Sequence, residues 1–332
     1  MHGRQQGMGG EIPQLRDGER LQAPSIEGAK AHGSLRIALL TILDTRMPRE
    51  PVASQPPPAL VLGIDAAWTA HNPSGVALVQ RATEGWQCLA LAPSYEAFFA
   101  LAAGTPLYGS QKAQGSEPDP EALLAACQQL AGQPVDCASV DMPLATTPHT
   151  SRRAADTAIA SRFGPKGCAV HSPSAERPGT IADQLRERFA ELGVPLHTTT
   201  PPRQGPALIE CYPHVALLAL LNRNYRVPYK VSRSALYWKA ERPPVAERVK
   251  RLLAEFTAIH QALGQRISAI PLTLPQPHEV TTLSSLKPVE DMLDALICAW
   301  IGIEHLEGRT VGLGDATAAI WVPQALTNHS PR

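Results

Sequence analysis

Six apolar runs of strand length alternate with turns and helices from residue 59 onward. Their content of Val, Ile, Leu and Ala between turn-forming residues predicts β-strands. The runs are ALVLGID, VALVQ, WQCLALA, CASVDMPL, ALIECYPH and AAIWVP. The first three follow one another closely and are joined by turn residues, so we expect them to form a three-stranded meander.

Apolar residues at helical spacing fill most of the intervals between these strands. Pro118 or Pro120 lies near the start of the second helix, where proline suits the first turn. The predicted helices cover residues 95–103, 119–131, 151–163, 180–192, 215–222, 245–263 and 288–306. Strands and helices in this order predict an α/β domain with a mixed sheet.

Residues 1–57 differ in composition from the rest of the chain. They combine Gly, Pro, Gln and scattered charges and end in SQPPPA, which favours an extended or disordered leader. A mis-assigned translation start and a functional arm are both open explanations of this segment. We expect the folded domain to cover residues 58–325 and a short tail to cover residues 326–332.

Composition places the chain among globular proteins. Of its 332 residues, 44% are hydrophobic and 18% are charged, and the formal net charge is zero, so attraction to nucleic acid requires local basic patches. The six cysteines show no CxxC pair and no zinc-finger spacing, as expected of buried thiols in a reducing compartment. No apolar stretch approaches the roughly 20 residues of a membrane span, and we expect a cytoplasmic protein.

Four aspartates are the strongest candidates for chemistry. Asp65 and Asp141 each end a strand-like run, while Asp291 and Asp294 lie one helical turn apart in EDMLDALICAW. A carboxylate among apolar neighbours is costly unless a hydrogen bond, a cation or a metal compensates it. Because no cation stands at a matching spacing beside either strand, the pattern predicts a divalent metal held by acids from two strands and one helix.

Structural roles for the same acids are the alternative. Asp65 could cap the turn that follows it, and Asp141 could accept hydrogen bonds from backbone N–H groups beside Pro143. Asp291 fits an acidic first turn that complements the helix dipole. Asp294 fits that explanation less well, because apolar side chains surround it on nearly every face of the predicted helix.

Several motifs resemble those of a known protein family. GIDAAWTAHNPSGVALV, SVDMPL, ECYPH with a following YK, and DMLDALICAW with a final IWVP are similar, in this order, to the family called domain of unknown function 429. The resemblance covers roughly residues 60–323. It implies a nuclease with an RNase H-like mixed sheet, in which a three-stranded antiparallel meander and parallel strands are flanked by helices. The arrangement of acids also resembles that of RuvC-type resolvases, which often have Glu where this chain has Asp141.

Further candidates lie in the motifs and in a loop. Glu210 in LIECYPH is a fifth candidate acid, because it follows an apolar pair and belongs to a motif of the resembling family. His214 could serve as a general acid or a phosphate contact, and it could equally be a hydrogen-bonded residue that opens a helix. His171, in the loop segment AVHSPS, is a candidate for substrate binding.

A basic segment, residues 222–251, holds nine cations and two acids with three tyrosines and one tryptophan between them. Cations for phosphates and aromatic faces for bases are what a nucleic-acid groove requires, although ordinary solvated surface often has the same composition. Lys230 is the first choice as a substrate contact, because the YK pair recurs in the resembling family. Arg152 and Arg153, at the start of the helix after Asp141, are the second choice.

These observations favour a metal-dependent nuclease. Mg²⁺ or Mn²⁺ would be held by Asp65, Asp141, Asp294 and Asp291, with Glu210 as a further catalytic acid, and DNA or RNA would be the partner. Two other classes stay open. One is a noncatalytic nucleic-acid or protein-binding module, and the other is an actin-like kinase, for which NPSG and GLGD are the only candidate phosphate loops. The sequence predicts no membrane partner and leaves the oligomeric state open.

Overall fold

The computed structural model describes residues 58–105, 113–148, 151–200 and 205–327. The chain divides into two units, Met1–Ser54 and Gln55–Arg332, and every described residue belongs to the second. The predicted leader, residues 1–57, and the end of the predicted tail, residues 328–332, lie outside the described residues.

One mixed sheet runs through the second unit. Eight strands in the described ranges pair in the order β6-β3-β2-β1-β4-β5-β8-β7. They are β1 (Leu60–Asp65), β2 (Gly75–Ala82), β3 (Gly85–Ala92), β4 (Cys137–Val140), β5 (Ala207–Cys211), β6 (Ile267–Ser268), β7 (Thr310–Gly314) and β8 (Ala319–Pro323). The meander β1, β2 and β3 is antiparallel, whereas β4, β5 and β8 extend the sheet parallel to β1.

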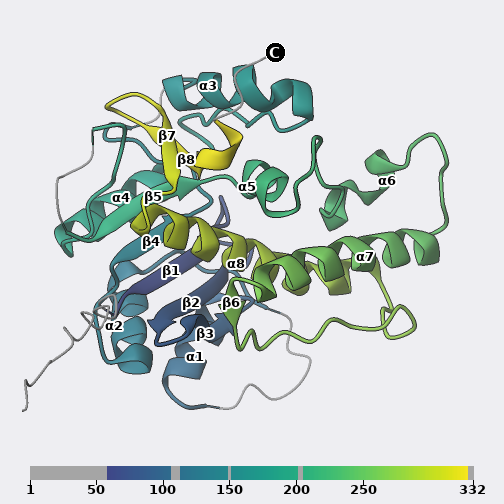
Figure 1. Cartoon of the computed structure of the whole chain (residues 1–332), viewed down its shortest axis with the longest axis horizontal. Helices are drawn as coiled ribbons and strands as arrows, with labels where there is room; N and C mark the ends of the chain where they lie inside the picture. Colours follow the sequence, from purple (N-terminus) through teal and green to yellow (C-terminus); the bar gives the residue numbers. More distant parts are fainter. Residues whose placement is uncertain (1–57, 106–112, 149–150, 201–204, 328–332) are drawn as a thin grey trace, which may run out of the picture. The chain divides into compact units, whose positions relative to one another are not determined.

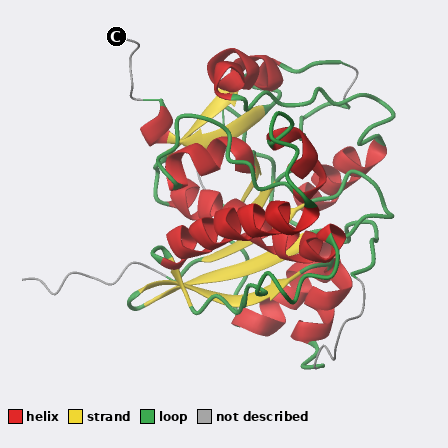
Figure 2. Cartoon of the chain, turned by 90° about the vertical axis from the view of Figure 1, so that its right-hand side faces the viewer, coloured by secondary structure: helices red, strands yellow, loops and turns green. Residues whose placement is uncertain are grey.

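Helices cover both faces of this sheet, and Figure 2 shows a long helix packed against the strands. The helices are α1 (Tyr95–Ala102), α2 (Pro120–Ala131), α3 (Ala154–Phe163), α4 (Thr180–Glu191), α5 (Pro213–Leu220), α6 (Ser234–Tyr237), α7 (Val245–Gly264) and α8 (Lys287–Leu306). Successive residues of β1 point to opposite faces, as the period of a strand requires. Val61 packs with the core beneath α5, α7 and α8, whereas Leu60 and Leu62 pack with the core beneath α1, α2 and α4 (Figure 1).

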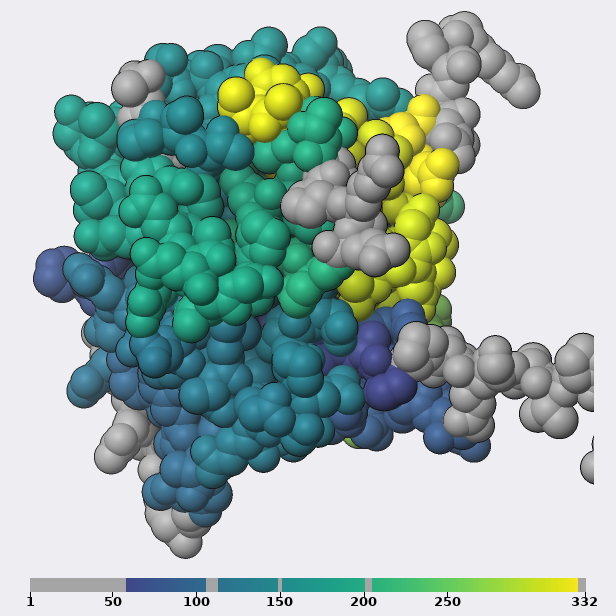
Figure 3. Space-filling model, turned by 90° about the vertical axis from the view of Figure 1, so that its left-hand side faces the viewer, coloured from purple at the N-terminus to yellow at the C-terminus, as the bar shows by residue number. Residues whose placement is uncertain are grey.

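The second of these helical layers includes α2 and α4, which contact each other. Figure 3 shows the side of the unit where the blue surface of α2 adjoins the teal surface of α4. Local signals fix the ends of α2: Asp119 caps its first turn by accepting a hydrogen bond from Ala122 N at 3.1 Å, and Gly132 ends it with a φ of 70°. Pro120 occupies the first turn, as the sequence suggested.

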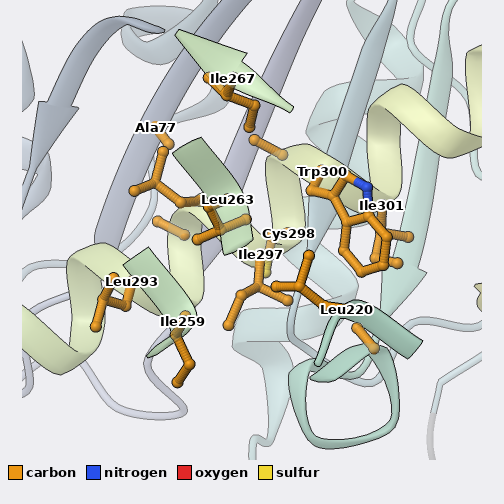
Figure 4. Packing of buried hydrophobic residues seen from close by; sticks show 14 of the residues in the cluster. Ala77, Leu220, Ile259, Leu263, Ile267, Leu293, Ile297, Cys298, Trp300 and Ile301 are labelled. Atoms are coloured by element: carbon orange, nitrogen blue, oxygen red, sulfur yellow. The ribbon is translucent and has the colours of Figure 1, made fainter. Parts of the chain in front are cut away.

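The central helix α8 lies directly against the sheet. A Cβ on Gly63 of β1 would lie 2.3 Å from the Ala295 carbonyl O, and one on Gly75 of β2 would lie 2.1 Å from the Asp291 carbonyl O. Glycine at these two positions therefore lets the helix backbone approach the strands. Figure 4 shows buried side chains that pack around α8 and α7, among them Leu293, Ile297, Ile259, Leu263 and Ile267.

The expected mixed α/β fold is confirmed, and most predicted elements are present within a few residues of their predicted bounds. The apolar pattern does not reveal two strands, because β6 has two residues and β7 has the glycine-rich sequence TVGLG. The predicted helix over residues 151–163 starts later, at Ala154. None of the helices in the described ranges combines the length and apolar character needed to cross a bilayer.

Candidate active site

The pairing of β1 with β4 brings the first two predicted acids together. Asp65 is the last residue of β1, and Asp141 directly follows β4 and donates its backbone N–H to the Ile64 carbonyl O at 2.9 Å. Two positions earlier, the register partners Gly63 and Ser139 both face α8. The strand period therefore directs both carboxylates toward the α8 side of the sheet.

The close approach of α8 adds Asp291 and Asp294 to this site. Gly75 is the register partner of Asp65 and lies against the backbone of Asp291. Burial, and then the charge of Asp65, raise the pKa of Asp291 to about 8. Burial raises the pKa of Asp294 to about 7, with Asp65 adding to the rise and Lys230 opposing it. The pKa of Asp141 is raised well above its ordinary value by burial and by Asp65, so the four acids share one electrostatic site.

Two lysines compensate these acids. Lys230 Nζ donates a hydrogen bond to Asp294 Oδ2 and lies 3.4 Å from Glu290 Oε1. Lys287 Nζ donates to Asp291 Oδ1, and to Glu290 Oε1 at 2.9 Å. The expectation that no cation accompanies the acids holds only along the strands themselves, because Lys230 comes from the loop after α5 and Lys287 is the first residue of α8.

Residues 229–231 attach this loop to α8. Tyr229 Oη donates to Asp294 Oδ1 at 2.6 Å, and the Val231 backbone N–H donates to Glu290 Oε2 at 2.6 Å. Burial disfavours the charged form of Lys230, but the facing carboxylates, Asp294 first, raise its pKa well above the ordinary value. The predicted phosphate contact Lys230 is thus bound to an acid of the site.

Glu290 is a member of the site that sequence reasoning missed. It is 1% exposed and accepts hydrogen bonds from Lys287 and the Val231 backbone. The sequence contained a signal for Glu290: Lys287 precedes Glu290 by three positions and Asp291 by four, which is the spacing of ion pairs along a helix.

Two adjoining cavities open at these strand ends. Asp65, Asp141 and Asp291 line the larger one, which has a volume of about 840 Å³. The smaller one, of about 310 Å³, is lined by Asp141, Glu210 and His214 among others. Six residues line both cavities, which therefore form one cleft: Trp68, Asp141, His171, Lys230, Ser232 and Lys287. Asp294 is fully buried and lines neither cavity.

Glu210 and Arg153 form a separate buried ion pair. Cys211 of β5 packs with the core beneath α8 and Leu208 with the opposite core, so the two-residue period places Glu210 on the face opposite Asp65 and Asp141. Arg153 binds both carboxylate oxygens of Glu210, at 2.5 and 2.7 Å. Burial raises the pKa of Glu210 although Arg153 opposes the rise. Each of these two residues thus compensates the other without a substrate.

The other predicted substrate contacts occupy different surroundings. His171 is exposed and lines both cavities. Arg152 donates to Ser172 Oγ at 2.7 Å and to the Asp156 carbonyl O at 2.8 Å, and it lines neither cavity. Its hydrogen-bond partner Ser172 does line the larger cavity, so Arg152 contacts a residue of the cavity wall without belonging to that wall.

His214 is buried and held in a neutral form. Its Nε2 lies 2.5 Å from Arg226 Nη2, and since a guanidinium only donates, Nε2 must accept and Nδ1 must carry the proton. Burial, and then the charges of Lys230, Arg226 and Arg233, lower the pKa of His214 well below its ordinary value. Its Nδ1 is buried and has no hydrogen-bond partner among the described residues.

The donor chemistry of the four aspartates suits a hard divalent cation. Asp291 Oδ2 is buried and lacks a hydrogen-bond partner among the described residues, as expected of a ligand oxygen reserved for a cation. Within those residues, however, no group of three or more His, Cys, Asp or Glu side chains is arranged to hold a metal. Lys230 and Lys287 supply the positive charge instead, so the Mg²⁺ or Mn²⁺ site stays a prediction.

A comparison with protein families bears on this cleft. The family model described as protein of unknown function (DUF429) matches residues 63–318. The chain belongs to the DUF429 family. The segment matched by DUF429 contains all four aspartates and both lysines of the cleft. No curated protein and no solved structure matches the chain.

Proposed function

We propose that this DUF429 protein is a metal-dependent phosphodiesterase that cleaves nucleic acid. The observation that carries the proposal is the convergence of Asp65, Asp141 and Asp291 on the larger cavity, of about 840 Å³, beside basic side chains. Ligands of α/β sheets bind at the carboxyl ends of the strands, which is where this cleft lies. The antiparallel meander followed by the parallel strands β4 and β5 is the arrangement expected of an RNase H-like fold and supports the same proposal.

Each charged group of the cleft has a role in the proposed reaction. Asp65, Asp141, Asp291 and Asp294 would hold Mg²⁺ or Mn²⁺, which when bound activates a water and stabilises the leaving oxygen. The raised pKa values of Asp141, Asp291 and Asp294 reflect burial and mutual repulsion, both of which a bound cation would offset. Lys230 and Lys287 would then be free to contact the phosphates of the substrate.

The ion pairs of Lys230 and Lys287 also support a second candidate function. In a noncatalytic nucleic-acid or protein-binding module, the acids of α8 would only position these two ammonium groups. This candidate predicts binding that does not depend on a metal, and no turnover. The two candidates therefore differ in the products formed.

Cleavage of labelled DNA and RNA, single- and double-stranded, tests the proposal. We expect products with Mn²⁺ or Mg²⁺ and none with EDTA. Asp65→Asn should abolish cleavage and leave the melting temperature unchanged or raised, because it removes a charge from an acid cluster while keeping the side-chain shape. Glu84→Gln, which removes one exposed carboxylate from the turn after β2, is the matched control and should cleave normally.

Two outcomes would contradict the assignment. Metal-dependent cleavage retained by Asp65→Asn would show that the reaction occurs elsewhere. Tight binding of nucleic acid by the unaltered chain, without products under any metal condition, would favour the binding module.

A further inference from the structure

The smaller cavity contains cations that no acid of the described residues compensates. Arg226 and Arg233 both line it, and neither forms an ion pair with a carboxylate among the described residues. Arg226 donates to the Gly167 carbonyl O at 3.2 Å and to His214 Nε2, and its own Nε is buried without a partner. A partly buried guanidinium without an anion is costly.

The acids that line the same cavity are largely engaged elsewhere. Asp156 and Glu210 share the guanidinium of Arg153. Glu290 binds Lys230 and Lys287. Asp141 is the remaining acid of the lining, and it belongs equally to the larger cavity. The end of the smaller cavity at Arg226 and Arg233 therefore has an excess of positive charge.

A third unsatisfied group, His214, lines the same cavity. It is 6% exposed, and its Nδ1 carries a proton with no acceptor among the described residues. The two guanidiniums need an acceptor that bears negative charge, whereas this neutral N–H needs only an acceptor. An anion with several oxygens in the cavity would satisfy the two guanidiniums.

We propose that the smaller cavity binds the terminal phosphate of a nucleic-acid strand. A terminal phosphate carries close to two negative charges at neutral pH and three free oxygens, whereas a phosphate inside a strand carries one charge. Two guanidiniums without carboxylate partners match the terminal group better. The volume of about 310 Å³ is at the lower end for ligand pockets and suits a strand end, not a duplex.

The shared lining gives the bound strand a path to the acids. Trp68, Asp141 and Lys230 belong to both cavities, so a strand whose end lies at Arg226 and Arg233 continues into the larger cavity. That the phosphate belongs to nucleic acid rests on the proposed function. Under this inference the protein acts on strand ends and not at interior positions.

Binding of single-stranded oligonucleotides in EDTA, followed by fluorescence anisotropy, tests the inference without cleavage. The same oligonucleotide is compared with a 5′-phosphate, a 3′-phosphate or hydroxyl groups at both ends. We expect one phosphorylated form to bind on the order of tenfold more tightly than the hydroxyl form. The double variant Arg226→Ala, Arg233→Ala should lose this preference.

A matched control separates the pocket from general attraction to basic surface. The double variant Lys239→Ala, Lys250→Ala removes two exposed cations and should weaken all three oligonucleotides equally, keeping the preference. Because Arg226 also bonds to Gly167 and His214, its replacement could disturb folding. The side chain of Arg233 makes no hydrogen bond within the described residues. Arg233→Ala alone should therefore reduce the preference with an unchanged melting temperature.

Several outcomes would overturn the inference. They are equal binding of phosphorylated and hydroxyl ends by the unaltered chain, and a preference that survives in the Arg226, Arg233 variant. A free nucleoside monophosphate that binds as tightly as the phosphorylated oligonucleotide would assign the cavity to free nucleotides instead. End preference without any metal-dependent cleavage would refute only the proposed nuclease, whereas cleavage that ignores the end would refute only the pocket.

Discussion

At the residue scale, the buried charges of this chain form two groups with different electrostatic balance. Arg153 lies between Glu210 and Asp156, and its guanidinium binds both carboxylates. The acids around Asp65 outnumber Lys230 and Lys287, and several of their pKa values rise as a result of burial and repulsion. Both carboxylates of the first group are bound to Arg153, whereas the second group has the larger excess of negative charge.

The group around Arg153 predicts that truncating this side chain has a large effect on stability. Arg153→Ala should lower the free energy of unfolding by about 3 to 5 kcal/mol, because it leaves Glu210 buried without its cation. Urea unfolding followed by circular dichroism measures the loss. Arg188→Ala, which breaks the exposed pair with Glu121, is the control and should leave the urea midpoint nearly unchanged. A stable Arg153→Ala protein that binds nucleic acid weakly would instead make Arg153 the substrate contact.

The acidic group predicts a pH dependence in the absence of metal. The folded-state pKa values of Asp291, about 8, and Asp294, about 7, lie above the ordinary value of 3.8, so folding takes up protons near neutral pH. The stability contributed by these protonated acids is complete below about pH 4 and is lost as the pH rises through 7 to 8. Melting temperatures in EDTA should therefore fall across this range.

Asp291→Asn provides the check on this dependence. The variant cannot gain the carboxylate charge, so its melting temperature should fall less between pH 5 and 8 than that of the unaltered chain. Glu84→Gln should show the unaltered slope. The same slope in Asp291→Asn as in the unaltered chain would remove Asp291 from the acid cluster.

At the scale of elements, the position of α8 decides whether the acids meet. Gly63→Ala would place a Cβ 2.3 Å from the Ala295 carbonyl O, so α8 must shift away from β1. We expect a loss of about 3 kcal/mol in the free energy of unfolding, together with loss of cleavage. Gly264→Ala, at the end of α7 with no atom within 4 Å of the new Cβ, should be neutral or slightly stabilising. Unchanged stability of Gly63→Ala would contradict the close packing.

Some of this arrangement follows from the sequence and some depends on contacts between distant segments. The meander and the parallel strands were predictable because β1 to β5 each carry an apolar run, whereas β6 and β7 lack one. The positions of Asp65 and Asp141 at the ends of strand-like runs identified both as candidate site residues. The ion pair of Lys230 with Asp294 joins residues 64 positions apart, and that of Arg153 with Glu210 joins residues 57 positions apart. No short-range sequence pattern predicts such pairs.

At the scale of the whole folded unit, the two cavities of the cleft differ in some of the charged groups that line them: Asp65 and Asp291 line only the larger cavity, and Arg226 and Arg233 line only the smaller one. Millimolar Mn²⁺ should raise the melting temperature, because a cation that binds only the folded state stabilises that state. At a hundred times the Kd, the free energy of unfolding rises by about 2.7 kcal/mol. EDTA should reverse the shift, and Asp65→Asn should reduce it. No shift at any Mn²⁺ concentration would mean that the lysines are the permanent partners of the acids.

The contact of α8 with Gly63 and Gly75 also limits how this protein can change during evolution. One residue inserted into α8 ahead of Asp291 would turn both aspartates by about 100° about the helix axis and advance them by about 1.5 Å. Insertions in the loops that border the cleft cause no such rotation, because the strand pairing and the contacts of Gly63 and Gly75 still determine the position of α8. Relatives of this chain should therefore differ in loop length around the cleft while keeping constant the number of residues from the start of α8 to Asp294.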